Sequence, residues 1–545
     1  MPEYLTPGVY VEEIEIGAKP IEGVSTSTAG FLGKTERGPT AVHLVTSFES
    51  FKRIYGSYIP ESYLAYAVEG FFNNGGKRCF IGRIVGNNAE KSSTTTPFKI
   101  DAVGAGTWGD KVGIIKDIAS RDLASGEKTP KFFKLIVGYW QNPDPKTASI
   151  ENADYLEIHD NLSEDPTSSE YYVNKLSEPK NESKLIKVSS SNPGNNPGNN
   201  PRTRTKKPER EKKNPEKNNP EKKSTGHKNT PNTQENIEPS KTPQFLTGGK
   251  DGDNLTAPDF KGSDKIGAKT GLTAFEEIDE ISIVYAPDIH KLADDTNKEE
   301  VMGKIILHCE NLKDRFAIFE AFNGSNDIAT LRTPKDTKYA AFYYPWVEIY
   351  DPLVKGPNFV PPGGHIAGIY ARSDTERGVH KAPANEVVRG VNDLEFIITG
   401  EEQGSLNPKG VNCIRSFPAR GIRVWGARTM SSDPLWKYIN VRRLFLYLEE
   451  SIDEGTQWVV FEPNDEKLWD RVKQTITQFL TQVWKDGALM GTKAEEAFFV
   501  KCDRTTMTQN DIDNGRLIVI IGVSPVKPAE FVIFRIAQWT AGAKS

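Results

Sequence analysis

The residue types that most often do chemistry are scattered along this sequence. Its 545 residues include seven histidines and many carboxylates, but no HExxH, GxSxG or EF-hand pattern brings them to catalytic or metal-binding spacing. The four cysteines stand far apart without a CxxC pair, which favours reduced thiols over a zinc site or a disulfide framework; they are Cys79, Cys309, Cys413 and Cys502. The sequence therefore predicts neither an enzyme nor a cofactor or metal site.

Two glycine-containing stretches are the remaining candidates for an anion site. Gly104–Gly109 matches GxGxxG, but Asp110–Ile115 then alternates like a strand, whereas a pyrophosphate site needs a helix N-terminus there. A glycine pair within Val360–His365 precedes a predicted helix at Ile366–Arg372 and could hold an anion. It lacks the GxxxxGK[ST] pattern, and His365 has no partner at catalytic spacing. Both stretches are therefore predicted to be structural turns.

The sharpest change in composition is an insertion at Ser189–Thr247, rich in Pro, Asn, Lys and Glu. It has too few apolar residues to offset the entropy of ordering. Within Pro201–Thr230, eleven Lys or Arg residues outnumber four Glu residues. This run is either a solvated surface insertion or a module that binds nucleic acid or another polyanion. No aromatic residues are interleaved to stack on bases, and the net charge of the whole chain is −5.

Outside this insertion, hydrophobic periodicity predicts a mixed α/β fold with several domains. An amphipathic helix at Tyr63–Asn73 leads through Asn73–Gly76 into a buried strand at Arg78–Val85. Beyond residue 249, strands alternate with helices, which is typical of a mostly parallel sheet. The other expected strands are residues 24–32, 42–45, 98–103, 111–118, 132–139, 278–286, 316–320, 339–350, 422–429, 498–502 and 516–523, and the other expected helices begin at Ser47 or span 298–311, 366–372, 436–451 and 464–485.

Two of these helices stand out in the C-terminal part of the chain. In the helix at Trp436–Ser451, Arg442 and Arg443 predict a basic surface patch. In the helix at Asn464–Lys485, a stripe of apolar residues predicts one buried face. Acidic residues in its first turn and Lys485 in its last turn suit the helix dipole.

Both ends of the chain are prone to form strands. Gly8–Ile16 alternates, so that Val9, Val11 and Ile14 can face a core while three glutamates stay in water. The last apolar run is Phe531–Trp539. These ends either pair inside their own domain, as most terminal strands do, or add strands to neighbouring copies of the chain.

Several stretches together resemble the tail sheath proteins of contractile injection machines. The similarity is greatest to sheaths of extracellular systems of the virulence-cassette and antifeeding-prophage type. It extends over about residues 1–120 and 250–545 and leaves out the insertion. The stretches that carry it are Thr6–Glu13, Val45–Phe51, Ala67–Val85, Gly106–Asp110, Tyr344–Pro352, Ala382–Glu386, Asn407–Thr429, Trp436–Arg443 and Pro525–Trp539.

The resemblance implies a structural subunit that polymerises as stacked hexameric rings around an inner tube. Its N-terminal and C-terminal arms each add a strand to a sheet in neighbouring subunits, and contraction releases energy stored at assembly. Pro20–Gly23 and Pro525–Pro528 are then expected hinges. The implied arm residues are Val9, Tyr10, Val11, Ile14, Phe531, Ile533, Phe534 and Ile536. The implied tube-facing residues of the Asn464–Lys485 helix are Lys467, Arg471, Lys473, Gln474 and Lys485.

Further partners implied by the resemblance are the inner tube protein, baseplate and terminator or cap proteins, and an AAA+ or similar accessory protein. No specific nucleic acid is expected. The N-terminus has no basic and apolar leader, and no apolar run is long enough to span a bilayer. We therefore expect assembly in the bacterial cytoplasm, without membrane insertion, followed by incorporation into a released phage-tail-like particle or a virion tail.

The resemblance and the changes in composition together divide the chain into expected parts. The sheath domain that faces the tube is expected to form from two separated stretches, and the middle of the chain is expected to face outward. The parts are residues 1–20 (N-terminal arm), 21–86 (inner sheath domain, first part), 87–188 (outer β-rich domain), 189–247 (insertion), 248–400 (α/β middle domain), 401–524 (inner sheath domain, second part) and 525–545 (C-terminal arm).

Overall fold

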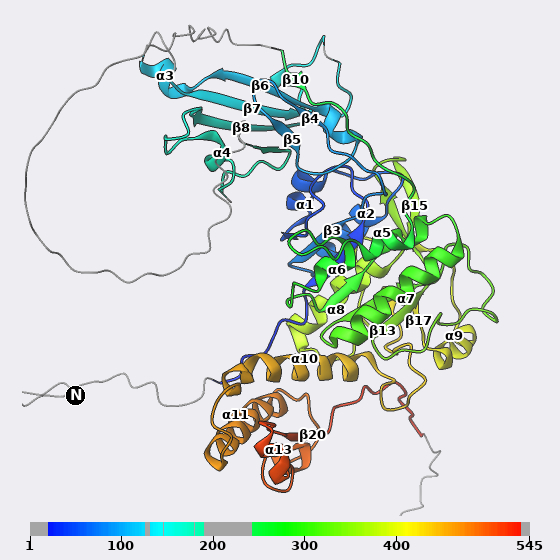
Figure 1. Cartoon of the computed structure of the whole chain (residues 1–545). Coiled ribbons are helices and arrows are strands. Elements are labelled where there is room, and N and C mark those ends of the chain that lie inside the picture. Colours follow the sequence, from blue (N-terminus) through cyan, green and yellow to red (C-terminus); the bar gives the residue numbers. More distant parts are fainter. Residues whose placement is uncertain (1–19, 126–130, 145, 179, 190–241, 536–545) are drawn as a thin grey trace, which may run out of the picture. The chain divides into compact units, whose positions relative to one another are not determined.

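The computed structural model describes residues 20–125, 131–144, 146–178, 180–189 and 242–535. Within these ranges the chain forms two compact units (Figure 1). The first unit combines the residues up to Asn87 with those from Gly252 onward, and the second is Asn88–Asp251. The two stretches of the first unit fold together because a strand from the N-terminal stretch pairs with strands from both.

The first unit is built on a mixed sheet, which has eight strands among the described residues, in the order β18-β17-β13-β12-β11-β1-β3-β2. Neighbours from β17 to β3 run parallel, and the two edge strands are antiparallel to their neighbours. Every residue of β1, β12 and β13 is buried, which is why these strands read as continuous apolar runs. The strands are β1 Ala29–Gly33, β2 His43–Val45, β3 Cys79–Arg83, β11 Ile283–Tyr285, β12 Phe316–Glu320, β13 Ala340–Tyr344, β17 Val411–Phe417 and β18 Gly421–Val424.

Helices cover this sheet and supply the rest of its core. They are α1 Phe48–Tyr55, α2 Leu64–Asn73, α5 Ala257–Lys261, α6 Gly271–Phe275, α7 Asp295–Leu312, α8 Gly363–Arg377 and α9 Gly400–Leu406. Helices α2 and α8 pack against each other so closely that a Cβ at Gly364 would lie 2.3 Å from the carbonyl oxygen of Ala67. The glycine pair at 363–364 is therefore not a turn, as its sequence suggested, but the first turn of α8, where it permits this close packing.

One long expected strand proves to be two. Residues 339–350 were predicted to be a single strand, but the chain leaves the main sheet after β13 and starts β14 at Val347. Proline has no N–H to donate to a ladder, and Pro345 lies at this break. Among the described residues β14 (Val347–Asp351) joins a three-stranded antiparallel sheet with β15 (Gly356–Val360) and β16 (Asp393–Leu394).

The C-terminal part of the first unit builds a second hydrophobic core. Its two long helices are α10 (Ile439–Thr456) and α11 (Glu466–Lys485). The apolar stripe of α11 is buried in this core together with Leu444 and Leu448 of α10. The smaller elements are α12 Ala494–Ala497, β19 Phe498–Lys501, α13 Gln509–Asp513 and β20 Ile520–Val523.

The second unit is rich in strands. In the part of it that the structure describes, β10, β6, β7 and β8 form a four-stranded antiparallel sheet, and β4, β5 and β9 form a three-stranded one. Strand β8 was not predicted, because its mostly half-buried, charged sequence YLEIHDNL lacks a clean alternation. The elements are β4 Ser93–Thr94, β5 Ile100–Ala102, β6 Val112–Ile118, α3 Ser120–Ser125, β7 Phe133–Tyr139, β8 Tyr155–Leu162, α4 Tyr172–Lys175, β9 Ile186–Val188 and β10 Gln244–Phe245.

The packing of α2 on α8 gives a test of the fold. Replacing Gly364 by Ala places a methyl group against the backbone of α2, and such overpacking typically costs about 1–3 kcal/mol. Gly404, in the middle of α9, has open space around its Cβ position and serves as a matched control. There the same replacement is expected to stabilise the protein, by up to about 1 kcal/mol. The measurement is the urea midpoint of each variant; equal shifts in the two variants would contradict this packing.

Candidate functional site

The N-terminal stretch just before β1 is held along α10. We name residues 21–28 the N-terminal strap. Ile21 is buried in the second core, against Gly455, and a Cβ at Gly23 would meet the ring and hydroxyl of Tyr447. Further along, the backbone N–H of Val24 donates to Ser451 Oγ at 3.1 Å. The strap therefore runs antiparallel to α10, starting near the C-terminal end of that helix.

A buried ion pair fixes the other end of the strap. Arg443 of α10 donates to both carboxylate oxygens of Asp374 of α8, at 2.9 and 2.6 Å. The same guanidinium donates to the carbonyl oxygen of Thr26 at 2.7 Å, and the Thr26 hydroxyl donates to Asp374 at 2.7 Å. Both charged side chains are at most 4% exposed. This cluster joins the strap, α8 and α10 in one hydrogen-bonded network.

The predicted basic patch on α10 is therefore wrong. Arg443 is buried, and its guanidinium is bound to Asp374 and Thr26 in the network just described. The guanidinium of Arg442 packs over the rings of Tyr339 and Trp436 and donates to Glu449 at 2.7 Å. Both arginine side chains are buried. Aromatic rings lie under each guanidinium, and Glu449 and Asp374 supply the negative charges that offset the cost of desolvating Arg442 and Arg443.

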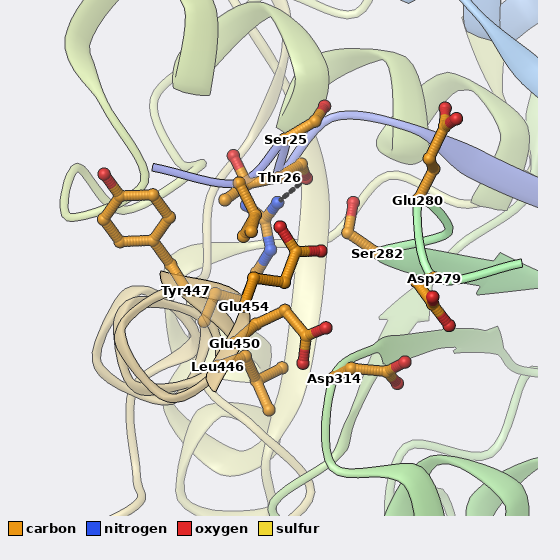
Figure 2. Close-up of a pocket in the computed structure, with 12 residues that line it drawn as sticks. Ser25, Thr26, Asp279, Glu280, Ser282, Asp314, Leu446, Tyr447, Glu450 and Glu454 are labelled. Atoms are coloured by element: carbon orange, nitrogen blue, oxygen red, sulfur yellow. Dashed lines mark hydrogen bonds between the residues drawn. The ribbon is translucent and has the colours of Figure 1, made fainter. Parts of the chain in front are cut away.

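Beside the strap lies an acidic pocket of about 170 Å³ (Figure 2). Asp279 and Glu280 come from the loop before β11, Asp314 from the loop before β12, and Glu450 and Glu454 from α10. Burial, reinforced by the charge of Asp314 and other nearby carboxylates, raises the pKa of Glu450 to about 7. Figure 2 shows Asp314 and Asp279 across this space from Glu450 and Glu454 of α10, whereas the Glu280 side chain points away and pairs with Arg78. Their repulsion acts where α10 meets the loops that lead into β11 and β12.

The C-terminal stretch is anchored by a single carboxylate. Glu530 accepts two hydrogen bonds from Arg428, both at 2.8 Å, one from Asn407 at 2.7 Å and one from Tyr438 at 3.1 Å. These hydrogen bonds lower the pKa of Glu530 even though its partial burial would raise it. A bidentate guanidinium–carboxylate pair with further donors is a strong and directional contact. We name these four residues the Glu530 clamp.

Beyond the clamp the chain carries exposed apolar side chains. Phe531, Val532, Ile533 and Phe534 are each at least 68% exposed, and residues 531–535 form no strand. Elsewhere in the first unit, β19 and β20 pair only with each other among the described strands. Phe499 of β19 and Ile520 of β20 are about half exposed. A two-stranded sheet with bare edges and exposed apolar residues is a template for further strands.

Val9, Tyr10, Val11, Ile14 and Ile536 lie outside the described residues, as does most of the insertion at 189–247. Their roles, and the polyanion-binding alternative, therefore stay predictions.

The five polar residues predicted to face a tube all lie on the exposed side of α11. They are Lys467, Arg471, Lys473, Gln474 and Lys485. Arg471 packs over the ring of Trp458, 4.5 Å from its centre. The opposite face is buried in the second core, and Asp465 caps the helix by accepting from the Leu468 N–H at 2.9 Å. The structure thus leaves these side chains available for contact, and what they contact stays a prediction.

The two anion-site candidates are occupied by the chain's own groups. The glycine-rich stretch at 104–109 leads into a short 3-10 helix, where Asp251 accepts from the N–H and the hydroxyl of Thr107. His365 is 3% exposed against α2, and burial lowers its pKa to about 4.

A histidine–carboxylate pair with catalytic geometry is also internal. His290 Nε2 lies 2.6 Å from Glu320 Oε1, which also accepts from the Tyr285 hydroxyl. The side chains of His290 and Glu320 are at most 4% exposed, so we assign this pair to the core.

In the described part of the chain, no cluster of three or more His, Cys, Asp or Glu residues is arranged to hold a metal ion. No helix within the same ranges has the length and apolar character needed to cross a membrane.

Sequence reasoning missed Thr26, Asp374, Arg443 and Glu530 as a group of anchoring residues. Thr26 and Asp374 are 348 positions apart, and no local pattern marks them. Glu530 had a weak signal, since it is the lone carboxylate in the apolar stretch Pro525–Phe534. A lone carboxylate in such a stretch is either exposed to solvent or bound by a specific partner.

The mixed α/β fold thus carries two stretches, the N-terminal strap and the residues before the C-terminal apolar run, that are each anchored by an arginine–carboxylate pair. Comparison with known proteins gives the family. The model of the phage tail sheath protein central domain matches residues 258–430, and that of the phage tail sheath C-terminal domain matches residues 431–538. Together they cover more than half of the chain. The chain belongs to the phage tail sheath family.

Individual relatives agree with this assignment. The tail sheath protein of Vibrio phage KVP40 is 28% identical over 200 residues, which is 36% of this chain and 29% of that protein. The match thus spans less than a third of this curated relative. In fold, the chain is similar to the contracted helical sheath of the anti-feeding prophage, with a TM-score of 0.55, 24% identity and coverage of 98% and 99%. It is equally similar to the contracted PVC sheath of an extracellular contractile injection system, with a TM-score of 0.56, 21% identity and 99% coverage of both chains.

The Glu530 clamp predicts how firmly the C-terminal stretch is held. Replacing Glu530 by Ala removes the hydrogen bonds that its carboxylate accepts from Arg428, Asn407 and Tyr438. A hydrogen bond that involves a charged group typically contributes about 1.5–3 kcal/mol to stability. We expect chymotrypsin to cleave after Phe531 about tenfold faster or more in this variant, because local opening becomes easier. Lys527→Ala, which alters the same segment without touching the clamp, is the control. An unchanged cleavage rate in the Glu530 variant would show that the clamp does not hold the segment.

The acidic pocket predicts a dependence of stability on pH. The folded state raises the pKa of Glu450 from 4.5 to about 7, so it binds this proton more tightly than the unfolded state. Stability is therefore lost as the pH rises from about 4.5 to about 7 and changes no further above that range. In Glu450→Gln this component disappears, so the variant gains stability over the parent at pH 8 and not at pH 4. Melting temperatures at both values test this, with the exposed Glu299→Gln as control. An equal gain at both pH values would refute the assignment.

Proposed function

We propose that this chain is the structural subunit of a contractile sheath around the inner tube of a phage-tail-like injection particle. It polymerises as stacked hexameric rings, linked by its two terminal arms, and contraction of the stack drives the tube through a target envelope. Family membership and the fold similarity to contracted sheaths support the class. The finer proposal rests on two features of the chain: the β19–β20 sheet pairs with no other described strand, and the C-terminal segment is anchored and carries exposed apolar residues.

This proposal assigns complementary roles to the C-terminal segment and the β19–β20 sheet. The apolar C-terminal segment is strand-prone, and the β19–β20 sheet has edges with unpaired backbone groups. The segment can form backbone hydrogen bonds with such a sheet wherever it reaches one of these edges. The Glu530 clamp holds residue 530, so residues 531 onward start at a fixed point of the surface. We assign β19–β20 of a neighbouring subunit as the acceptor of the strand at Phe531–Ile536.

The two stretches in which hinges were expected, Pro20–Gly23 and Pro525–Pro528, contain anchored residues. Pro20–Gly23 was expected to bend, but Ile21 and Gly23 are packed against α10. Pro525 is likewise bridged to Leu489, and Val526 donates to Ala488. We therefore place the flexible joints outside these contacts, before residue 21 and after residue 530. Movement between subunits would then leave the contacts of the N-terminal strap and of residues 525–530 intact.

The remaining partners follow from the sheath role. The exposed polar face of α11 is proposed to contact the inner tube protein. Baseplate and cap proteins bound the stack, and an accessory ATPase acts on it from outside the chain. The role proposed for the subunit is mechanical, and no enzymatic role is proposed. Assembly in the cytoplasm followed by release with the particle is part of the same proposal.

Assembly tests this function directly. The chain is co-expressed with its tube protein and viewed by negative-stain electron microscopy. The full chain is expected to form regular tubes, whereas removal of residues 531–545 is expected to leave subunits or single rings. Removal of residues 540–545 alone, which spares the apolar run, is the matched control and should still give tubes. Long tubes without residues 531–545 would refute the proposed linkage, and no tubes from the full chain would refute the sheath role.

A further inference from the structure

The connection between α10 and α11 carries a fully exposed aromatic side chain in a strained backbone conformation. Phe461 is fully exposed, and Val460 beside it is 58% exposed. The φ of Phe461 is +70°. Residues with bulky side chains rarely adopt this left-handed conformation, because Cβ then lies too close to the following carbonyl oxygen. Strain and an exposed ring at the same residue are typical of a contact site rather than of a residue that serves the fold.

The rest of the connection holds this ring at a fixed place. We name residues 459–463 the α10–α11 tip. At one end of the tip, Val459 packs against the second core, and just after its other end Asn464 accepts from the Trp469 indole N–H at 2.7 Å. Within the tip, the N–H of Glu462 donates to the carbonyl oxygen of Val459 at 3.2 Å. A backbone that is already ordered loses little entropy when it binds a partner, so the tip is pre-organised for contact.

A groove of about 840 Å³ with a complementary lining lies elsewhere in the first unit. We name it the Trp425 groove. Its apolar lining includes Trp425, Ala427, Val526 and Pro528, all of which are partly exposed. A groove of this size with an accessible indole suits an aromatic side chain together with its neighbours in a chain.

Basic side chains surround this apolar lining. Arg377, Arg415 and Lys527 line the groove, and no described carboxylate lies within salt-bridge distance of them. Glu530, the acidic lining residue of the groove, is already bound by Arg428. In the described chain the groove therefore offers three positive charges without an acidic partner.

The α10–α11 tip has the matching character. Its sequence, Val-Val-Phe-Glu-Pro, combines apolar residues with one carboxylate and contains no basic residue. That carboxylate, Glu462, is 45% exposed and lies 4.0 Å from Arg471, which is beyond hydrogen-bond length. An apolar ring beside a free carboxylate is complementary to an apolar lining inside a basic rim.

The tip and the groove lie at opposite ends of one helix. Tyr438 and Asn440 line the groove at the start of α10, whereas the tip follows soon after Thr456, the last residue of that helix. The 18 residues of α10 span about 27 Å at 1.5 Å per residue. Because the tip is anchored at both ends, it cannot cross this distance to the groove of its own chain.

We propose that the α10–α11 tip of one copy inserts into the Trp425 groove of a second copy, with Phe461 against Trp425 and Glu462 at the basic rim. The two surfaces differ, so each copy uses its tip toward one neighbour and its groove toward another, and the contact can repeat from copy to copy. This inference rests on the proposed function, since it needs copies side by side. It adds a contact between the folded parts of two subunits to the links proposed for the terminal arms.

Cross-linking between two distinguishable copies tests the proposal. Full-length copies with different affinity tags are co-expressed with the tube protein; one carries Val460→Cys in the tip and the other Ala382→Cys in the groove. A short bis-maleimide joins thiols that lie close together, and the native cysteines are buried in the described structure. We expect a covalent pair that contains both tags. In the control, Ile266→Cys on an exposed loop replaces the groove cysteine and should give at least tenfold less product.

Replacing Phe461 by Gly separates a contact role from a role in the fold. Glycine adopts a φ of +70° without steric cost, so the urea midpoint of the purified subunit is expected to stay the same or rise. The cross-link yield from Val460→Cys is expected to fall about tenfold, because the ring that enters the groove is lost. A ring that served only the fold would give the opposite result, a lower midpoint with an unchanged yield.

Charge reversal tests whether the basic rim receives Glu462. Glu462→Lys in the tip copy is expected to lower the cross-link yield about tenfold. Arg377→Glu with Lys527→Glu in the groove copy is expected to restore it, which a merely structural effect of the first change would not allow.

A yield no greater than that of the Ile266 control would overturn the proposal. So would loss of tubes in Phe461→Gly with an unchanged cross-link yield, since the tip would then contact the tube protein. If the parent chain forms tubes that depend on residues 531–545, the proposed function survives either result.

Discussion

The Arg443–Asp374 ion pair is the contact on which the arrangement of the first unit depends. Burying two charges is costly, and such a pair persists only where hydrogen bonds satisfy it on several sides. Here the carboxylate also accepts from Thr26, and the guanidinium also binds the Thr26 carbonyl and lies over the ring of Tyr370. The network therefore couples α8 of the main sheet, α10 of the second core and the strap that continues into the N-terminal arm.

Helix α10 is the element where both ends of the chain are fixed. The N-terminal strap is bound toward its C-terminal end, through Gly455 and Ser451. The C-terminal stretch is bound at its N-terminal end, through Asn440 and the neighbouring Tyr438. A force applied through either arm therefore reaches the same helix, and from there the main sheet through Arg443. Under the proposed function, this arrangement would keep the load between linked subunits on rigid elements.

The groups that looked capable of chemistry serve packing and internal capping. Asp251 occupies the donors that a phosphate would use at Thr107, and the glycine pair of α8 brings two helices together. His290 and Glu320 satisfy each other in the core, as do Tyr343 and Tyr370 at 2.7 Å. The side chains of His290, Glu320, Tyr343 and Tyr370 are buried, whereas Asp251 and Thr107 lie at the surface. The acidic pocket is different, because its carboxylates oppose one another and make the junction of α10 with the loops before β11 and β12 sensitive to protons.

The amino-acid sequence by itself determined the α/β class, the amphipathic α11 with acidic residues at its start, most strands of the main sheet, and the family resemblance. These follow from local periodicity and short motifs, which a linear reading preserves. Only the tertiary structure decided that Pro345 separates two sheets, that Arg442 and Arg443 are buried, and that Glu530 is held by Asn407, Arg428 and Tyr438. The physical reason is that a charge is paired or exposed according to its neighbours in space, and those neighbours lie up to 417 residues away along the chain.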